Sequence, residues 1–234
     1  MRRTLVPLLS TRSVVLLGAM LLAAVALVIV SLALSPKKAD AATTLVTKSF
    51  SNTHRITIPE GANAPECLDG GPGSIGPAVP YPSNVSASFP TGTKVKDVNV
   101  TLRNYSHTFP DDVDVLLVHS GKNRTIMSDV GGSEDVNNIT LKLDDEASNG
   151  HLPDDSILSG GTFKPTNVTE DGSDAIDNFD FPAPNNVSTN SALSGFDGLS
   201  ARGAWKLFVQ DDADDDCGRF GGGWTVQIKA AVPQ

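Results

Sequence analysis

The stretch from residue 203 to residue 228, GAWKLFVQDDADDDCGRFGGGWTVQI, contains two runs of alternating apolar residues on either side of an acidic, glycine-rich segment. The apolar positions are Trp205, Leu207 and Val209 in the first run and Trp224, Val226 and Ile228 in the second. Apolar side chains at every second position are typical of a strand with one buried face. The stretch therefore predicts two β-strands joined by an acidic turn.

The same alternation occurs in three earlier runs, Ile56–Ile58, Val98–Leu102 and Ile139–Leu143. Val113–Val118 is almost continuously apolar, as expected for a central strand that is covered on both faces. Segments rich in Gly, Pro, Asn, Asp and Ser separate the runs, and no amphipathic helical pattern competes with them. The predicted fold is all-β, an antiparallel β-sandwich of jelly-roll-like (galactose-binding-like) architecture.

The first 42 residues are predicted to be an export segment with an apolar helix. Arginines at positions 2, 3 and 12 precede an uncharged stretch of 23 residues, 13–35. Small residues at Ala39–Ala41 match what signal peptidase reads, so we expect cleavage after Ala41 or Ala42. The apolar stretch is also long enough to span a bilayer, which leaves an uncleaved anchor as the alternative. Either way, residues 43–234 are expected to form a single secreted or extracellular domain.

The chain is acidic, with a formal net charge of −9. Five basic residues and one acidic residue fall within residues 1–42, so the remainder carries −13. An acidic surface repels phosphate backbones and anionic lipid headgroups. We therefore expect no nucleic-acid partner, and a membrane contact only if the N-terminal segment is uncleaved.

The chain has two cysteines, Cys67 and Cys217. An even number of cysteines in an exported chain predicts a disulfide rather than a metal or redox pair. The bridge would close a loop of about 150 residues and contribute on the order of 4–5 kcal/mol in the chain-entropy model. Two unpaired thiols are the alternative.

The ending of the chain resembles that of the P domain, or P/Homo B domain, of subtilisin-like proprotein convertases. The closing pattern of this family, Gly-x-Trp-x-Leu-x-Val-x-Asp, is matched at residues 203–211. Gly218 and the run from Trp224 to Ile228 match the rest of the ending. Upstream, Val98–Leu102 and Ser106–Leu117 are similar to the family's early strand and its Asp-Leu-x-Ile-x-Leu strand.

The chain also departs from the family in two places. It has His119–Lys122 where the family has a Ser-Pro-x-Gly turn, and its middle region is expanded with acidic turns. The resemblance implies a β-sandwich fold and an association with serine endopeptidases, whose P domain stabilises and tunes the attached protease. It extends over the whole chain after the export segment, so we expect a standalone module without a catalytic domain.

Aspartates gather at three places in the predicted sandwich. They are Asp111, Asp112 and Asp114 before the central strand, Asp144 and Asp145 after another strand, and Asp211, Asp212, Asp214, Asp215 and Asp216 in the last turn. A divalent cation such as Ca²⁺, which takes six to eight oxygen ligands, would relieve their mutual repulsion. The predicted Ca²⁺ ligands are Asp112, Asp114, Asp211 and Asp212, with Asp111, Asp145 and Asp214 as further candidates. A merely solvated acidic surface is the alternative.

No catalytic residue and no organic cofactor is predicted. Gly71–Gly76 satisfies Gly-x-Gly-x-x-Gly, but Pro72 and Pro77 interrupt the stretch and no helical pattern follows, so it is interpreted as a loop. There is no Gly-x-Ser-x-Gly elbow, and the histidines lack metal-ligand spacing. His107, beside the first aspartate group, is interpreted as structural.

These observations predict a secreted, non-catalytic module with a binding or stabilising role, stabilised by Ca²⁺. Its partner would be an extracellular protein or a cell-surface polymer. Two alternatives stay open. A carbohydrate-binding or adhesive jelly-roll would require exposed aromatic residues, and a role in proteolysis rests on family analogy alone.

Overall fold

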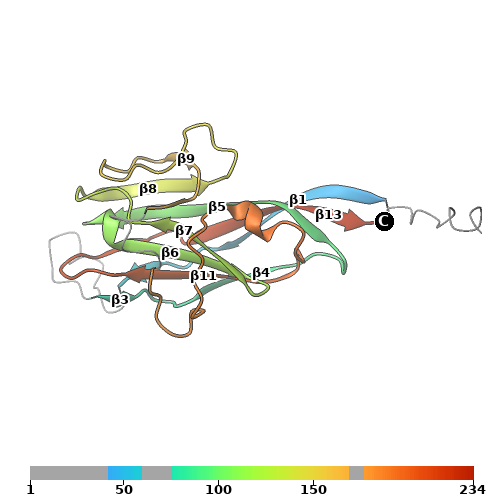
Figure 1. The fold of residues 1–234 in the computed structure, drawn as a ribbon, viewed down its shortest axis with the longest axis horizontal. Helices are drawn as coiled ribbons and strands as arrows, with labels where there is room; N and C mark the ends of the chain where they lie inside the picture. The colour runs from blue at the N-terminus through green and yellow to red at the C-terminus, as the bar shows by residue number, and fades with distance from the viewer. Residues whose placement is uncertain (1–41, 60–74, 169–176) are drawn as a thin grey trace, which may run out of the picture. The chain divides into compact units, whose positions relative to one another are not determined.

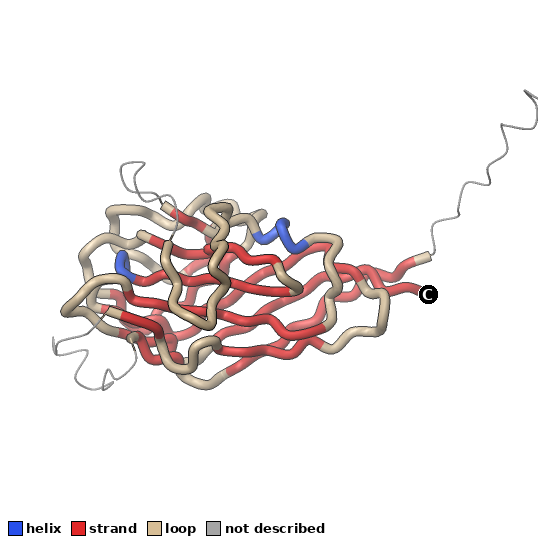
Figure 2. The backbone as a smooth tube through the Cα atoms, turned by 60° about the horizontal axis from the view of Figure 1, so that its bottom comes forward, coloured by secondary structure: helices blue, strands red, loops and turns tan. Residues whose placement is uncertain are grey.

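The structure is a computed structural model that describes residues 42–59, 75–168 and 177–234. Residues 42–234 form one compact unit. The described chain is mostly strand and loop, with two short 3₁₀ helices, η2 (Pro110–Asp112) and η3 (Leu193–Phe196) (Figure 2). No helix in these ranges is long and apolar enough to cross a bilayer. The predicted export segment, residues 1–42, lies almost wholly outside the described residues.

The strands form two mixed sheets that do not close into a barrel (Figure 1). The first sheet contains β1 (Thr43–Asn52), β2 (Ile56–Ile58), β5 (Lys94–His107), β8 (Val136–Leu143), β9 (Gly161–Phe163), β12 (Gly218–Phe220) and β13 (Trp224–Pro233). The second contains β3 (Gly76–Pro77), β4 (Ser83–Ala87), β6 (Val113–His119), β7 (Lys122–Ser128), β10 (Thr166–Asn167) and β11 (Gly203–Asp211).

Two long strands organise the sheets. β5 pairs with β13, β12 and β8, and β11 pairs with β6, β4 and β3. Most pairs are antiparallel, as predicted, but β8 with β9 and β7 with β10 are parallel. Parallel neighbours require a crossover connection, and each of these pairs is joined by a long excursion of the chain that alternation alone does not reveal.

One hydrophobic core is shared by both sheets. Val100, Leu102 and Trp224 come from the first sheet, and Leu117 and Trp205 from the second; all five are completely buried. Each lies on the predicted apolar face of its strand, so the period-two pattern did identify the buried faces. Burying a large apolar side chain contributes about 1.5–3 kcal/mol.

The nearly continuous apolar run of β6 is covered on both faces, as its sequence predicts. Leu117 belongs to the shared core, whereas Leu116 packs on the other face against Phe208 and Ala183. Tyr81 and residues of the segment 179–187 cover this second cluster. β6 lies between β7 and β11, and its first residues bring the acidic groups of three loops together.

Candidate metal centre

The acidic site lies where β6 starts and where β7 and β11 end. Antiparallel pairing sets Asp114 of β6 opposite Gln210 of β11, and Val115 opposite Met127 of β7. Asp129 follows β7 directly, and Asp211 is the last residue of β11. The sheet register therefore gathers carboxylates from segments that are far apart in the sequence.

Three of these carboxylates form a compact group. One oxygen each from Asp114, Asp129 and Asp177 lies within 4.8 Å of the other two. Asp114 is 2% exposed, and the other two are half-buried. Such an arrangement of like charges is unfavourable unless protons or a cation neutralise it.

Ser128 lies at the centre of the group. Its Oγ is 2.7 Å from Asp129 Oδ2 and 2.9 Å from Asp177 Oδ1. A hydroxyl carries one proton and can donate it to only one of these oxygens at a time. No ion pair within the described residues joins Asp114 or Asp129 to a lysine or arginine.

The pKa values of these aspartates reflect their burial and their closeness to one another. Burial, together with the charges of Asp177 and Asp212, raises the pKa of Asp114 well above its usual value. Burial raises the pKa of Asp129 to about 6, against the effect of the Ser128 hydroxyl. The pKa of Asp112 rises to about 7 because of burial and the charge of Asp211. These groups hold their charge poorly without a counter-ion.

Asp211 has a different environment from the group around Ser128. Its Oδ2 lies 3.2 Å from Nε2 of His107, and both side chains are completely buried. The two atoms are close enough for an ion pair when the imidazole is protonated. Burial raises the pKa of Asp211, and the neighbouring His107 lowers it. His107 and Asp211 thus form a buried pair beside the three-carboxylate group.

The pairing of β12 with β5 beside His107 depends on a glycine. Gly218 of β12 pairs with His107 of β5, and a Cβ at Gly218 would collide with the Ser106 carbonyl and the His107 ring. A side chain here would push β12 away from the strand that carries His107. Position 218 therefore requires a glycine for steric reasons.

The predicted ligands are divided by the structure. Asp114 alone belongs to the three-carboxylate group. The charges of Asp111 and Asp212 act on Asp129, whereas Asp112 is affected by Asp211, Asp216, Asp212 and Asp111. Asp112 also accepts the backbone N–H of Asp212 through its carbonyl oxygen, at 3.1 Å.

Two other candidates lie elsewhere. Asp145 accepts the backbone N–H groups of Leu193 and Ser194 at 2.9 and 2.8 Å, so its carboxylate caps η3. Asp214 is exposed in the β11–β12 turn. Neither is part of the compact group that the described residues contain.

Sequence reasoning did not find Asp129 and Asp177. Asp129 stands alone after β7, and Asp177 lies 49 residues beyond Ser128, the residue that links it to the group. The one available signal was the Ser-Asp pair at the end of a strand that neighbours the central strand. Which loop meets which strand is a property of the topology.

The predicted disulfide involves Cys217, which is buried and is not a free thiol. Cys67 lies outside the described residues. The Cys67–Cys217 pairing stays a prediction.

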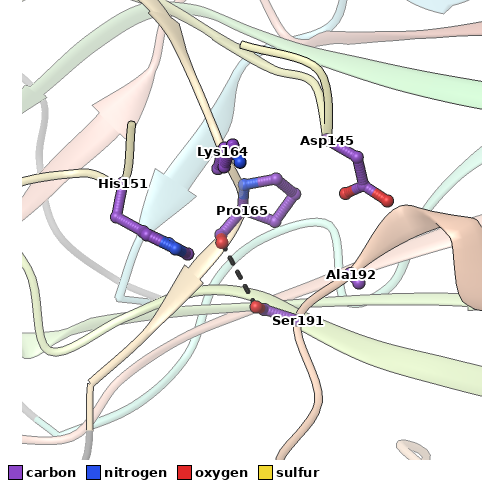
Figure 3. A pocket seen from close by; sticks show the side chains of 6 residues that line it. All are labelled: Asp145, His151, Lys164, Pro165, Ser191 and Ala192. Carbon is purple, nitrogen blue, oxygen red and sulfur yellow. Dashed lines mark hydrogen bonds between the residues drawn. The ribbon is translucent and has the colours of Figure 1, made fainter. Parts of the chain in front are cut away.

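A second candidate site is a pocket of about 280 Å³ lined by Asp145, His151, Lys164, Pro165, Ser191 and Ala192 (Figure 3). Ser, His and Asp side chains meet here, as a hydrolase would require. However, the Ser191 hydroxyl donates to the Pro165 carbonyl at 3.2 Å, and both Asp145 oxygens accept backbone N–H groups. The pocket therefore does not have the serine–histidine–aspartate relay of hydrogen bonds.

Comparison with known proteins identifies no relative. No family model matches the chain, no curated protein is significantly similar to it, and no solved structure matches it.

Proposed function

We propose that this protein is an exported, non-catalytic β-sandwich module of the P/Homo B type that binds Ca²⁺ through Asp114, Asp129 and Asp177. The observation that carries the proposal is the group of three carboxylates around Ser128. The expected role is binding or stabilisation of an extracellular protein or a cell-surface polymer.

The spacing of the carboxylates fits a calcium ion. Ca²⁺ binds oxygen ligands at about 2.3–2.6 Å, so two ligands of one ion are at most about 5 Å apart. The three oxygens, all within 4.8 Å of one another, satisfy this limit. Carboxylates that bind in bidentate mode, together with water, would complete six to eight ligands.

The fold supports the type of module. Two sheets share one core, which is the arrangement of a sandwich, and the family-like ending forms β11, β12 and β13. Two residues of that ending, Asp211 and Gly218, lie at the acidic site.

Isothermal titration calorimetry with Ca²⁺ tests this function. Exported protein, stripped of metal and held in about 0.15 M salt to screen exposed charges, should bind Ca²⁺ saturably. Asp129→Asn should weaken binding at least about tenfold, because it removes one charged ligand from the site. Mg²⁺ should bind more weakly, since it requires shorter, near-octahedral coordination.

A matched control is available near Asp177. Asp180 is an exposed aspartate, and Asp180→Asn removes the same charge without removing a ligand of the proposed site. It should leave Ca²⁺ affinity within about twofold, whereas Asp177→Asn should reduce it as Asp129→Asn does. Equal, small effects of all three substitutions would mean that the acidic end is only a solvated surface.

A carbohydrate-binding role is the second candidate, and one observation favours it. Phe181 is 91% exposed, and an exposed aromatic ring can stack on a sugar. Gln210 fixes the segment before it by bonding to Asn178 and Asp180 at 2.8 and 2.9 Å. Glycan-array binding that is lost in Phe181→Ala would favour this role over the first.

A further inference from the structure

The longest sheet edge in the described part of the chain is β1. This ten-residue strand pairs with β13 on one side, and no described strand pairs with its other side (Figure 1). The other edge strands, β2, β3, β4, β9 and β10, have between two and five residues. Short edges limit strand-to-strand association. β1 lacks that protection, contains no proline, and has Lys48 as its one charged residue.

The hydrogen-bond pattern shows which residues of β1 face the open side. The N–H of Gln234 donates to the carbonyl of Ala42 at 3.1 Å, and the register continues with Thr44 opposite Val232. In an antiparallel ladder every second residue bonds to the same neighbour. Even-numbered residues of β1 therefore bond to β13, and Thr43, Leu45, Thr47 and Ser49 direct their N–H and C=O groups outward.

We propose that this open edge of β1 binds a second copy of the chain. Two β1 strands would pair antiparallel about a two-fold axis at Val46, joining two sheets into one continuous sheet. Thr43 would lie opposite the Ser49 of the other copy, and Leu45 opposite Thr47. All outward backbone groups from Thr43 to Ser49 would then be paired, giving about eight hydrogen bonds.

The side chains suit this self-pairing. The central pair is two valines, and β-branched cross-strand pairs stabilise sheets. Lys48 lies opposite Thr44, so no like charges face each other across the axis. An isologous contact of this kind closes at two copies. The dimer would therefore cover both open edges and would not extend into a fibre.

The contact is expected to be weak. It is built from one strand per copy and lies below the size of a standard interface, so a dissociation constant of the order of micromolar is expected. The two acidic bodies repel each other, and added salt should tighten the dimer. The inference does not depend on the proposed calcium site.

Sedimentation velocity of the exported protein, from about 1 μM to 1 mM, tests the dimer. The account expects a monomer–dimer equilibrium. Thr47→Pro removes an outward N–H without removing a bond to β13, and should weaken dimerisation at least about tenfold. Thr47→Val retains the N–H and should dimerise like the parent protein. A monomer at 1 mM, or equal dimerisation of Thr47→Pro and Thr47→Val, would overturn the proposal.

Two charge variants at Thr44 test the register independently of proline. Thr44 is exposed, and in the proposed dimer it lies opposite Lys48. Thr44→Glu should tighten the dimer and Thr44→Lys should weaken it, each by severalfold, because the pair is created twice. Equal affinities of these two variants would contradict the axis at Val46.

Discussion

The two ends of β6 each bury a polar residue, and they differ in how that residue is satisfied. Near the end of the strand, His119 is 2% exposed, and its Nδ1 and Nε2 lie 2.9 and 2.6 Å from the carbonyl oxygens of Ala204 and Ser200. Its ring stacks on Trp205 at 3.9 Å with an interplanar angle of 2°. Near the start, the neighbours of buried Asp114 are the Ser128 hydroxyl and the carboxylates of Asp129, Asp177 and Asp212.

This difference shows which end can depend on a ligand. At the His119 end, both ring nitrogens lie within hydrogen-bond distance of oxygen atoms of the protein itself. At the Asp114 end, three carboxylates lie close together around the Ser128 hydroxyl, and protons or a cation would relieve their mutual repulsion. A buried polar group costs free energy unless it is paired, and the acidic end should therefore respond to pH and to Ca²⁺ while the His119 end should not respond to Ca²⁺.

The largest expected effect on stability comes from a substitution at the His119 end of β6. His119→Ala removes the hydrogen bonding of the buried ring to the neighbouring backbone carbonyls and the stack on Trp205, and should destabilise the domain by about 3 kcal/mol. Urea unfolding measures the loss. His54→Ala, at an exposed histidine, should change stability by less than about 0.5 kcal/mol.

The distinction between the two ends of β6 is wrong if the stability lost in His119→Ala changes with Ca²⁺. The account requires the same loss, within error, in EDTA and in excess Ca²⁺. A cost that depends on the cation would mean that the two ends are coupled through β6.

A smaller effect is expected at Asp145, an acidic residue that has its partners. Asp145→Ala removes the cap of η3 and should cost about 1 kcal/mol. Thermal unfolding with and without Ca²⁺ should show equal losses, because both carboxylate oxygens already accept backbone N–H groups. A loss that appears only with Ca²⁺ would restore Asp145 as a metal ligand.

Much of the fold could be predicted because alternation reports burial of one face. The runs in β5, β11 and β13 were identified in this way, and so was the doubly covered β6. The alternation did not reveal β1, whose residues are mostly exposed. It also did not reveal that β9 pairs parallel with β8 and β10 with β7. These features depend on neighbours that a local pattern does not contain.

The site could be predicted only in part, for the same reason. Asp114 was identifiable because an acidic residue at the start of a buried strand requires compensation. Asp129 and Asp177 carry no such local mark. Asp129 reaches the proposed site because β7 lies beside β6, and Asp177 because it bonds to Ser128 at the end of β7. Asp145 resembled them in sequence, yet the chain folds it onto a helix start.

The most direct test measures the thermal stability of the protein from pH 5 to pH 8, with EDTA and with Ca²⁺ at about 100 times its dissociation constant. Asp129 and Asp112 have pKa values raised to about 6 and 7, so the folded state binds more protons than the unfolded state in this range. Without Ca²⁺, stability should therefore fall as the pH rises through 6 and 7.

Calcium at the proposed site would bind the charged form of Asp114, Asp129 and Asp177, and should reverse the part of this loss that these carboxylates cause. We predict a gain that grows with pH and reaches about 2.7 kcal/mol, or several degrees, near pH 8, and that Asp129→Asn abolishes most of it while Asp180→Asn does not. A calcium effect of equal size at every pH, unchanged in Asp129→Asn, would contradict a calcium site at Asp114, Asp129 and Asp177.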